Sequence, residues 1–182
     1  MVKNSSIHLN IIKNRITDVK KQIKKDIKLV NILGEYDSTP LHYACREKNL
    51  EIVKILIKNG ANINQKNRYS TLYPIFDTLI YINKRDPFPI IELLIKSGAD
   101  INSVDSFGNT LLHHAVEQEN MKLIELLITY GCNINYTLRH DKDTPLHYAC
   151  FRKNRKIIYT LIENNANREA LNIYNRTPES YL

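Results

Sequence analysis

The sequence lacks the long apolar runs of membrane-spanning and secreted chains. No segment reaches about 18 apolar residues in a row, the least that a membrane-spanning helix needs. Residues 1–15 interrupt their apolar positions with Lys3, His8 and Lys13, so they do not form the continuous apolar stretch of a signal peptide. We therefore expect a soluble protein of the cytoplasm without a transmembrane segment, with the nucleus as the alternative compartment.

Cysteine is scarce as well. The three cysteines, Cys45, Cys132 and Cys150, are an odd number and lack the CxxC spacing of zinc and redox sites. Unpaired thiols of this kind indicate a reducing compartment, where disulfides rarely persist. We expect free, structural cysteines and no bound metal.

Catalytic motifs are also lacking. The sequence holds no GxSxG, P-loop, HExxH or dinucleotide-binding glycine pattern. Its acidic residues are scattered over positions typical of a surface. We therefore expect no enzymatic activity and no cofactor; an enzyme stays open only if its site uses no recognisable pattern.

What the chain does contain is a recurring heptad. Thr39-Pro-Leu-His-Tyr-Ala-Cys45 returns unchanged at residues 144–150, and residues 110–116 are a close variant. An apolar run and a small turn residue follow each copy at a fixed distance, which predicts a stack of repeated units. Each threonine stands 21 residues before its turn residue, in the pairs Thr39 and Gly60, Thr110 and Gly131, and Thr144 and Asn165.

The heptad is built to begin a helix. A threonine before proline offers a side-chain oxygen to cap the helix start, and the proline fits the first turn because its missing N–H is not needed there. Leu41 and Ala44 follow at helical spacing and are expected to face the neighbouring helices. Each repeat thus begins at a defined residue.

This heptad and its spacing resemble the ankyrin repeat, which has a period of about 33 residues and a TPLHxA signature. The resemblance covers essentially the whole chain and implies an all-α solenoid of about five helix-turn-helix repeats with protruding hairpin loops, in one domain. For the histidine of the signature it implies hydrogen bonding between hairpins. The structural motif residues are Thr39, His42, Thr110, His113, Thr144 and His147. The predicted repeats span residues 5–38, 39–71, 72–109, 110–143 and 144–176, and a partial sixth repeat spans 177–182.

The third repeat departs from the pattern. It begins Leu72-Tyr-Pro-Ile-Phe76 and is about six residues longer than its neighbours, with the insertion expected at residues 81–88 between its two helices. Tyr81, Arg85 and Phe88 make this loop a candidate contact element, because aromatic residues and arginine dominate binding hot spots. The alternative is a tolerated surface insertion whose aromatic rings pack back on the repeats.

The resemblance also implies where a partner would bind, namely at the hairpin tips and the exposed face of each first helix, which together form a concave groove. The expected tip residues are Glu35, Tyr36, Arg68, Tyr69, Ser106, Phe107, Asn109, His140 and Asp141. The expected helix residues are Tyr43, Arg46, Glu47, His114, Glu117, Gln118, Tyr148, Phe151 and Arg152. This mixture of aromatic rings and both charge signs favours a protein partner over nucleic acid. Phe107 and Phe151 are the expected anchors.

The composition bears on origin. The chain is rich in Ile, Asn, Lys and Tyr, a bias typical of A/T-rich coding, and its repeats resemble those of poxviral and intracellular-pathogen ankyrin proteins that act on host proteins, without the F-box-like segment of many poxviral members. We expect a monomeric, non-catalytic adaptor or inhibitor that binds a host protein in the host cytoplasm. A more specific form is an inhibitor of NF-κB-type transcription factors.

A basic amino-terminal end supplies the competing hypothesis. Residues 1–35 carry eight of the 26 Lys and Arg residues but three of the 19 Asp and Glu residues, so most of the net charge of +7 lies there. Such a cluster could bind nucleic acid or an anionic membrane, or it could be only the solvated side of an end cap. The cluster consists of Lys20, Lys21, Lys24, Lys25 and Lys28.

Overall fold

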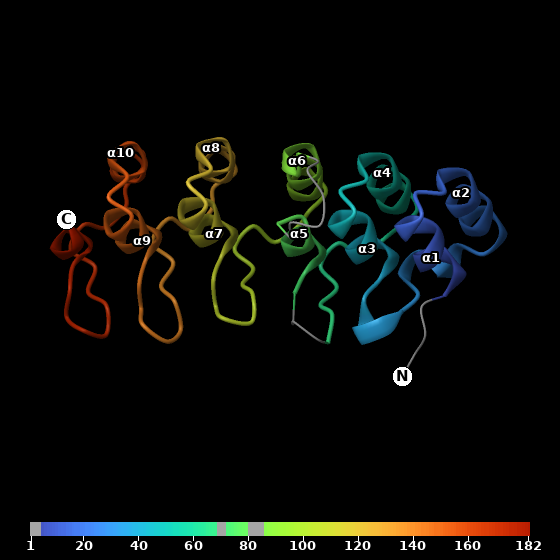
Figure 1. Cartoon of the computed structure of the whole chain (residues 1–182), viewed down its shortest axis with the longest axis horizontal. Coiled ribbons are helices and arrows are strands. Elements are labelled where there is room, and N and C mark those ends of the chain that lie inside the picture. The colour runs from blue at the N-terminus through green and yellow to red at the C-terminus, as the bar shows by residue number, and fades with distance from the viewer. Residues whose placement is uncertain (1–4, 69–71, 80–85) are drawn as a thin grey trace. The chain divides into compact units, whose positions relative to one another are not determined.

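The computed structural model describes residues 5–68, 72–79 and 86–182 (Figure 1). It divides into two compact units, Met1–Asp100 and Ile101–Leu182, and each is described by itself. Pairs of helices stack along each unit, and in each the loops between repeats project to one side of the helices (Figure 1). The predicted all-α class is confirmed, whereas the single domain over residues 1–182 stays a prediction.

Unit 1 holds the first three helix pairs. In the first two pairs the two helices pack against each other, and first helices pack on first helices of the next pair, as α1 does on α3 and α3 on α5. Short 3-10 turns connect the first pair to the second. The elements are α1 (Ser6–Ile12), α2 (Ile16–Lys25), η1 (Ile27–Asn31), η2 (Glu35–Asp37), α3 (Pro40–Arg46), α4 (Leu50–Lys58), α5 (Pro74–Asp77) and α6 (Phe88–Lys96).

Unit 2 holds two further pairs and the start of another. The last 3-10 turn packs on α9 in the place where a next first helix would begin. Its elements are α7 (Leu111–Glu117), α8 (Met121–Thr129), α9 (Pro145–Phe151), α10 (Arg155–Glu163) and η3 (Pro178–Tyr181).

The threonine and histidine of the heptad fasten each first helix. Thr39 caps α3 and its backbone N–H donates to His42 Nδ1 at 3.0 Å, so the ring proton lies on Nε2, which donates to the Leu72 carbonyl of the next hairpin at 3.2 Å. His113 Nε2 reaches the Asp143 carbonyl in the same way at 3.4 Å. These bonds join the start of a first helix to the hairpin that leads to the next helix pair.

Asparagine side chains cap the second helices and hydrogen-bond successive loops to each other. Asn49, Asn120 and Asn154 cap α4, α8 and α10, each accepting a backbone N–H of the first turn. In the loops, Asn135 donates to the Asn165 carbonyl at 3.0 Å and accepts the Asn167 N–H at 2.7 Å. The abundance of asparagine, which we attributed to coding bias, therefore has a structural use.

The third repeat is irregular from its first residue. Its first helix, α5, has only four residues, and Phe76 stands where the other repeats carry the bridging histidine. Pro87 precedes α6 as its N-cap, and Phe88 is the first residue of α6 and half-buried. The expectation that Phe88 lies in the inserted loop is therefore wrong, because the helix starts earlier than expected. Tyr81 and Arg85 lie outside the described residues.

Candidate partner-binding surface

In unit 1, a hydrogen bond and an ion pair connect the tips of successive hairpins. The Tyr36 carbonyl accepts the Arg68 N–H at 2.7 Å, and the Arg68 guanidinium pairs with Asp37 at 2.8 Å. Tyr36 is exposed and has a positive φ of 58°, while Glu35 begins the same 3-10 turn. Tyr69 lies outside the described residues.

Of the helix residues predicted in unit 1, Tyr43 is buried, whereas Arg46 and Glu47 are partly exposed. Tyr43 is only 8% exposed, because its ring packs against His8 at 5.0 Å and the Arg46 guanidinium lies over it at 5.6 Å. Arg46 in turn pairs with Asp77 at 2.8 Å. Glu47 follows as the C-cap of α3. Little of the Tyr43 ring is left for a partner to contact.

Asp77 is a buried carboxylate that sequence reasoning missed. Its side chain is fully buried, and burial raises its pKa to about 6 against the opposing effect of Arg46. Among the described residues, no donor bonds its second oxygen, Oδ2. The available signal was its register, because Asp77 stands where Tyr43 and Tyr148 stand in other repeats.

In unit 2, the first tip is organised by Asp105. This carboxylate accepts the backbone N–H groups of Phe107 and Asn109 at 2.9 and 2.8 Å, and it pairs with His114 Nε2 at 2.8 Å. Phe107 is 72% exposed at the tip, next to Ser106. Phe107 is therefore an exposed aromatic ring on a hydrogen-bonded turn.

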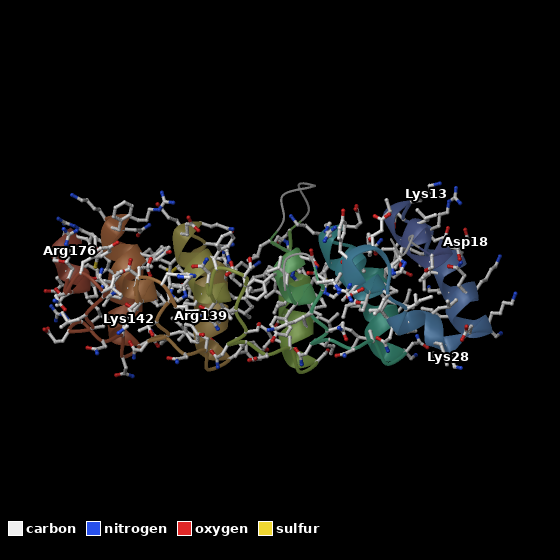
Figure 2. The ribbon with its side chains drawn as sticks, turned by 90° about the horizontal axis from the view of Figure 1, so that it is seen from below. Lys13, Asp18, Lys28, Arg139, Lys142 and Arg176 are labelled. Carbon is white, nitrogen blue, oxygen red and sulfur yellow. The ribbon has the colours of Figure 1, made fainter. Side chains whose placement is uncertain are left out.

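The second tip of unit 2 contains His140 and Asp141. The Asp141 carbonyl accepts the Ile173 N–H of the last hairpin at 2.9 Å, so successive tips are linked here as in unit 1. Arg139, Lys142 and Arg176 lie along the hairpin side of this unit (Figure 2). Basic side chains therefore accompany Asp141 on this side, whereas the first tip of unit 2 carries the carboxylate of Asp105.

Four predicted helix residues of unit 2 meet around one pocket of about 430 Å³. They are joined by three residues that we did not predict as partner-binding, of which Tyr181 comes from η3. Gln118, also predicted, is the exposed C-cap of α7 and does not line it. The pocket, called here the α9 pocket, is lined by Glu117, Asp143, His147, Tyr148, Phe151, Arg152 and Tyr181.

Aromatic rings form the walls of the α9 pocket. Phe151, 68% exposed, meets Tyr181 edge-on at 6.2 Å, and His147 meets the same ring at 6.2 Å. Asn172, which is buried, donates to the Tyr181 hydroxyl at 2.9 Å and to Asp143 Oδ1 at 2.8 Å. One buried amide therefore holds a ring and a carboxylate of the pocket in place.

Carboxylates dominate the electrostatics of the α9 pocket. Burial, and then the carboxylates of Asp141, Glu117 and other acidic residues, raise the pKa of Tyr148 to about 12. Arg152 opposes them, but it approaches Glu117 only to 4.0 Å and both side chains are about half exposed, so the pair is weak. The phenol of Tyr148 therefore stays neutral in an acidic field.

Among the described residues, neither the cysteines nor any group of potential metal ligands forms a second site. Burial raises the pKa of Cys132 and of Cys150 to about 11, so both thiols stay protonated near neutral pH, and Cys45 is fully buried. In the part of the chain that the structure describes, no three His, Cys, Asp or Glu side chains gather as a metal site. None of the described helices has the length and apolar character to cross a membrane.

Known proteins share this sequence pattern. The chain matches the family described as "Ankyrin repeats (3 copies)" over residues 79–172 and the family described as "Ankyrin repeat" over residues 36–68. An ankyrin repeat protein of fowlpox virus (strain NVSL) is 33% identical over 141 residues, which cover 78% of this chain and 22% of the relative. A second fowlpox virus ankyrin repeat protein is 30% identical over 146 residues, or 80% of this chain and 25% of the relative.

Cellular relatives match over a similar stretch. Palmitoyltransferase ZDHHC17 of Danio rerio is 33% identical over 174 residues, which cover 94% of this chain and 27% of that protein. The chain thus spans about a quarter of the length of these viral and cellular curated relatives.

Proposed function

Because this chain belongs to the ankyrin-repeat family, we propose that it is a non-catalytic adaptor or inhibitor that binds a host protein. Ankyrin repeats form protein-interaction modules, and the viral relatives share the pattern over 78% and 80% of this chain. The match to a palmitoyltransferase concerns about a quarter of that enzyme, which gives no reason to assign its activity here. In this proposal the chain acts by binding a partner protein on its surface.

The α9 pocket is the observation that supports the proposal best. It gathers Tyr148, Phe151 and Arg152, residue types that dominate binding hot spots, in one concave place. Interface cores favour aromatic residues and arginine in this way, with polar groups at the rim. The largely exposed Phe151 ring is the anchor.

A capture experiment with matched variants tests this function. The tagged chain is incubated with lysate of infected or transfected host cells, and bound proteins are quantified by mass spectrometry for wild type, Phe151→Ala and Tyr159→Ala. Tyr159 is the control because its ring is 62% exposed on α10 but lies outside the α9 pocket. We expect Phe151→Ala to lose a partner that Tyr159→Ala retains. Equal capture by all three chains would remove the support for this surface.

The narrower expectations belong to the same proposal. We place the protein in the host cytoplasm as a monomer, and the inhibition of an NF-κB-type transcription factor is its most specific form. A fluorescent fusion and sedimentation equilibrium test the first two points. A reporter gene under an NF-κB-type promoter tests the third, with Phe151→Ala as the variant expected to lose inhibition.

A second candidate rests on the exposed lysines of α2. Val19 and Ile23 are buried while Lys21, Lys24 and Lys25 are exposed, so one face of the helix is basic. Lys20 is engaged with Glu51 at 3.0 Å, which lowers the charge available to a ligand. Binding of duplex DNA or anionic vesicles that falls steeply with salt would favour this candidate. Salt-independent or absent binding would dismiss it.

A further inference from the structure

The α9 pocket has the chemistry of a cation site. Of its ionisable side chains, Glu117 and Asp143 are carboxylates and Arg152 is the one guanidinium, and the pKa of Tyr148 is raised partly by Asp141, Glu117, Asp143 and Asp105. Two carboxylates face one guanidinium in the lining, so the local field is net negative. An anionic partner group would meet this field unfavourably, and a cationic one favourably.

The rings of the pocket suit the same ligand. The face of an aromatic ring attracts a cation within about 6 Å of its centre. Arginines of the chain itself lie over Tyr43 at 5.6 Å and over Tyr181 at 5.8 Å, whereas among the described residues no cation lies over Tyr148. The His113 ring already meets the Tyr148 ring at 5.6 Å in a T-shaped contact, so only the parts of the Tyr148 and Phe151 rings that line the pocket form the aromatic walls of a cation site.

Arg152 already places a cationic group of the chain itself beside the carboxylate of Glu117. Its guanidinium stands 4.0 Å from Glu117 Oε1, and both side chains are about half exposed, so a competing cation can displace it at little cost. The pocket volume of about 430 Å³ lies near the small end of ligand pockets, which suits one side chain better than a folded element.

We propose that the α9 pocket binds a single cationic side chain, lysine or arginine, presented by a partner protein, and that this side chain takes the place of Arg152 beside Glu117. The inference deepens the proposed function and rests on it. Asp143, held by Asn172, provides the second carboxylate, and the rings of Tyr148 and Phe151 flank the cation.

Short peptides test the chemistry without knowledge of the partner. The isotope-labelled chain is titrated with Ac-Gly-Gly-Lys-Gly-Gly-amide, its arginine counterpart, the neutral norleucine counterpart and the glutamate counterpart, and backbone amide shifts are followed by NMR. We expect saturable shifts around Phe151, Arg152 and Tyr181 with a Kd on the order of 1–10 mM for the two cationic peptides. Norleucine should bind at least about fivefold more weakly, and glutamate should not bind.

Two charge variants should change the affinity in opposite directions. Glu117→Gln removes a carboxylate and should weaken lysine-peptide binding roughly threefold to fivefold, while Arg152→Gln removes the internal competitor and should strengthen it about twofold to threefold. Glu125→Gln and Arg155→Gln, exposed changes on α8 and α10 outside the pocket, serve as matched controls and should leave the affinity unchanged.

Three results would overturn the proposal. These are no saturable shift at about 20 mM of either cationic peptide, equal binding of the lysine and norleucine peptides, and a loss of affinity in Arg152→Gln. Circular dichroism shows that each variant is folded before it is titrated. If Phe151→Ala loses its captured partner while the cationic peptides fail to bind, the protein-binding function stands and only the cation specificity is wrong.

Discussion

Residues 39–45 and 144–150 have the same sequence but present different surfaces. Their internal bonds agree, because each histidine accepts the backbone N–H of its threonine and reaches the next hairpin carbonyl, at 3.2 Å from His42 and 3.1 Å from His147. Yet Tyr43 is almost completely buried while Tyr148 lines an open pocket.

The difference comes from one residue after each heptad and from its partner in the next repeat. Arg46 pairs with the buried Asp77 and covers Tyr43, whereas Phe151 meets Tyr181 edge-on and leaves Tyr148 accessible. The heptad therefore determines how a repeat is held, and the positions around it determine what a partner meets.

Acid should produce the largest effect on stability and should separate the two kinds of buried group. Burial lowers the pKa of His42 and His113 from 6.5 to about 4, so the unfolded chain binds their protons first as the pH falls. The contribution of these two histidines to stability should therefore be fully present above pH 6.5. It should decline as the pH falls towards 4, by on the order of 3 kcal/mol for each histidine.

Asp77 should act in the opposite sense. Its pKa is raised from 3.8 to about 6, so its burial penalty is relieved as the pH falls from 6 to 3.8. Urea unfolding between pH 7 and 4.5 checks both effects, and Asp77→Leu should steepen the acid loss. Unchanged stability across this range would contradict the assignment of the histidines as buried and neutral.

Removal of Arg46 should rank next. Arg46→Ala leaves the Asp77 carboxylate buried without its counter-charge and should lower the free energy of unfolding by about 2–4 kcal/mol. The double variant Arg46→Leu, Asp77→Leu should recover most of this loss, because it removes the buried charge as well. Urea unfolding at pH 7 measures both, and a single variant as stable as wild type would show that the pair does not hold unit 1 together.

Loss of the bridging histidine should weaken the two identical heptads alike. His42→Ala and His147→Ala each remove a cap contact and a hydrogen bond to the following hairpin, so each should lower stability by about 2 kcal/mol. Amide hydrogen exchange should report the loss separately in each unit. An effect in only one unit would mean that the same histidine hydrogen bonds stabilise the two units to different extents.

The aromatic pair should have the smallest effect on stability. Because Phe151 and Tyr181 meet near the surface, Phe151→Ala should lower the free energy of unfolding by no more than about 1 kcal/mol. A double-mutant cycle with Tyr181→Ala isolates their interaction, with Tyr159→Ala as the exposed-aromatic control. A loss several times larger would indicate a packing role and weaken the case for Phe151 as a binding anchor.

Much of the skeleton was predictable from local patterns. The threonine caps, the prolines and the stripe of Leu41 and Ala44 place the first helices within a residue or two, and both stripe residues are fully buried. The third repeat was less predictable, because a four-residue helix leaves few periodic positions. Asn49 and its counterparts repeat at one register, which would have identified them as helix caps.

The candidate surface was predictable only in part. The family pattern selects positions on the first helices, and in unit 2 four of those residues do gather in one pocket. In unit 1 the tyrosine at the same position, Tyr43, is covered, because Arg46 lies over its ring while paired with Asp77. Sequence spacing gives the face on which a residue lies but not which neighbour covers it.

By itself, the sequence determined the starts of the regular first helices, the repeat period and the family, because capping, proline placement and apolar spacing act over a few neighbouring residues. The tertiary structure alone decided which tyrosine is covered, which aspartate is buried and where carboxylates and rings meet. Those outcomes depend on side chains about one repeat apart, as Arg46 is from Asp77 and Phe151 from Tyr181, and burial and electrostatic fields arise only when such residues are packed together.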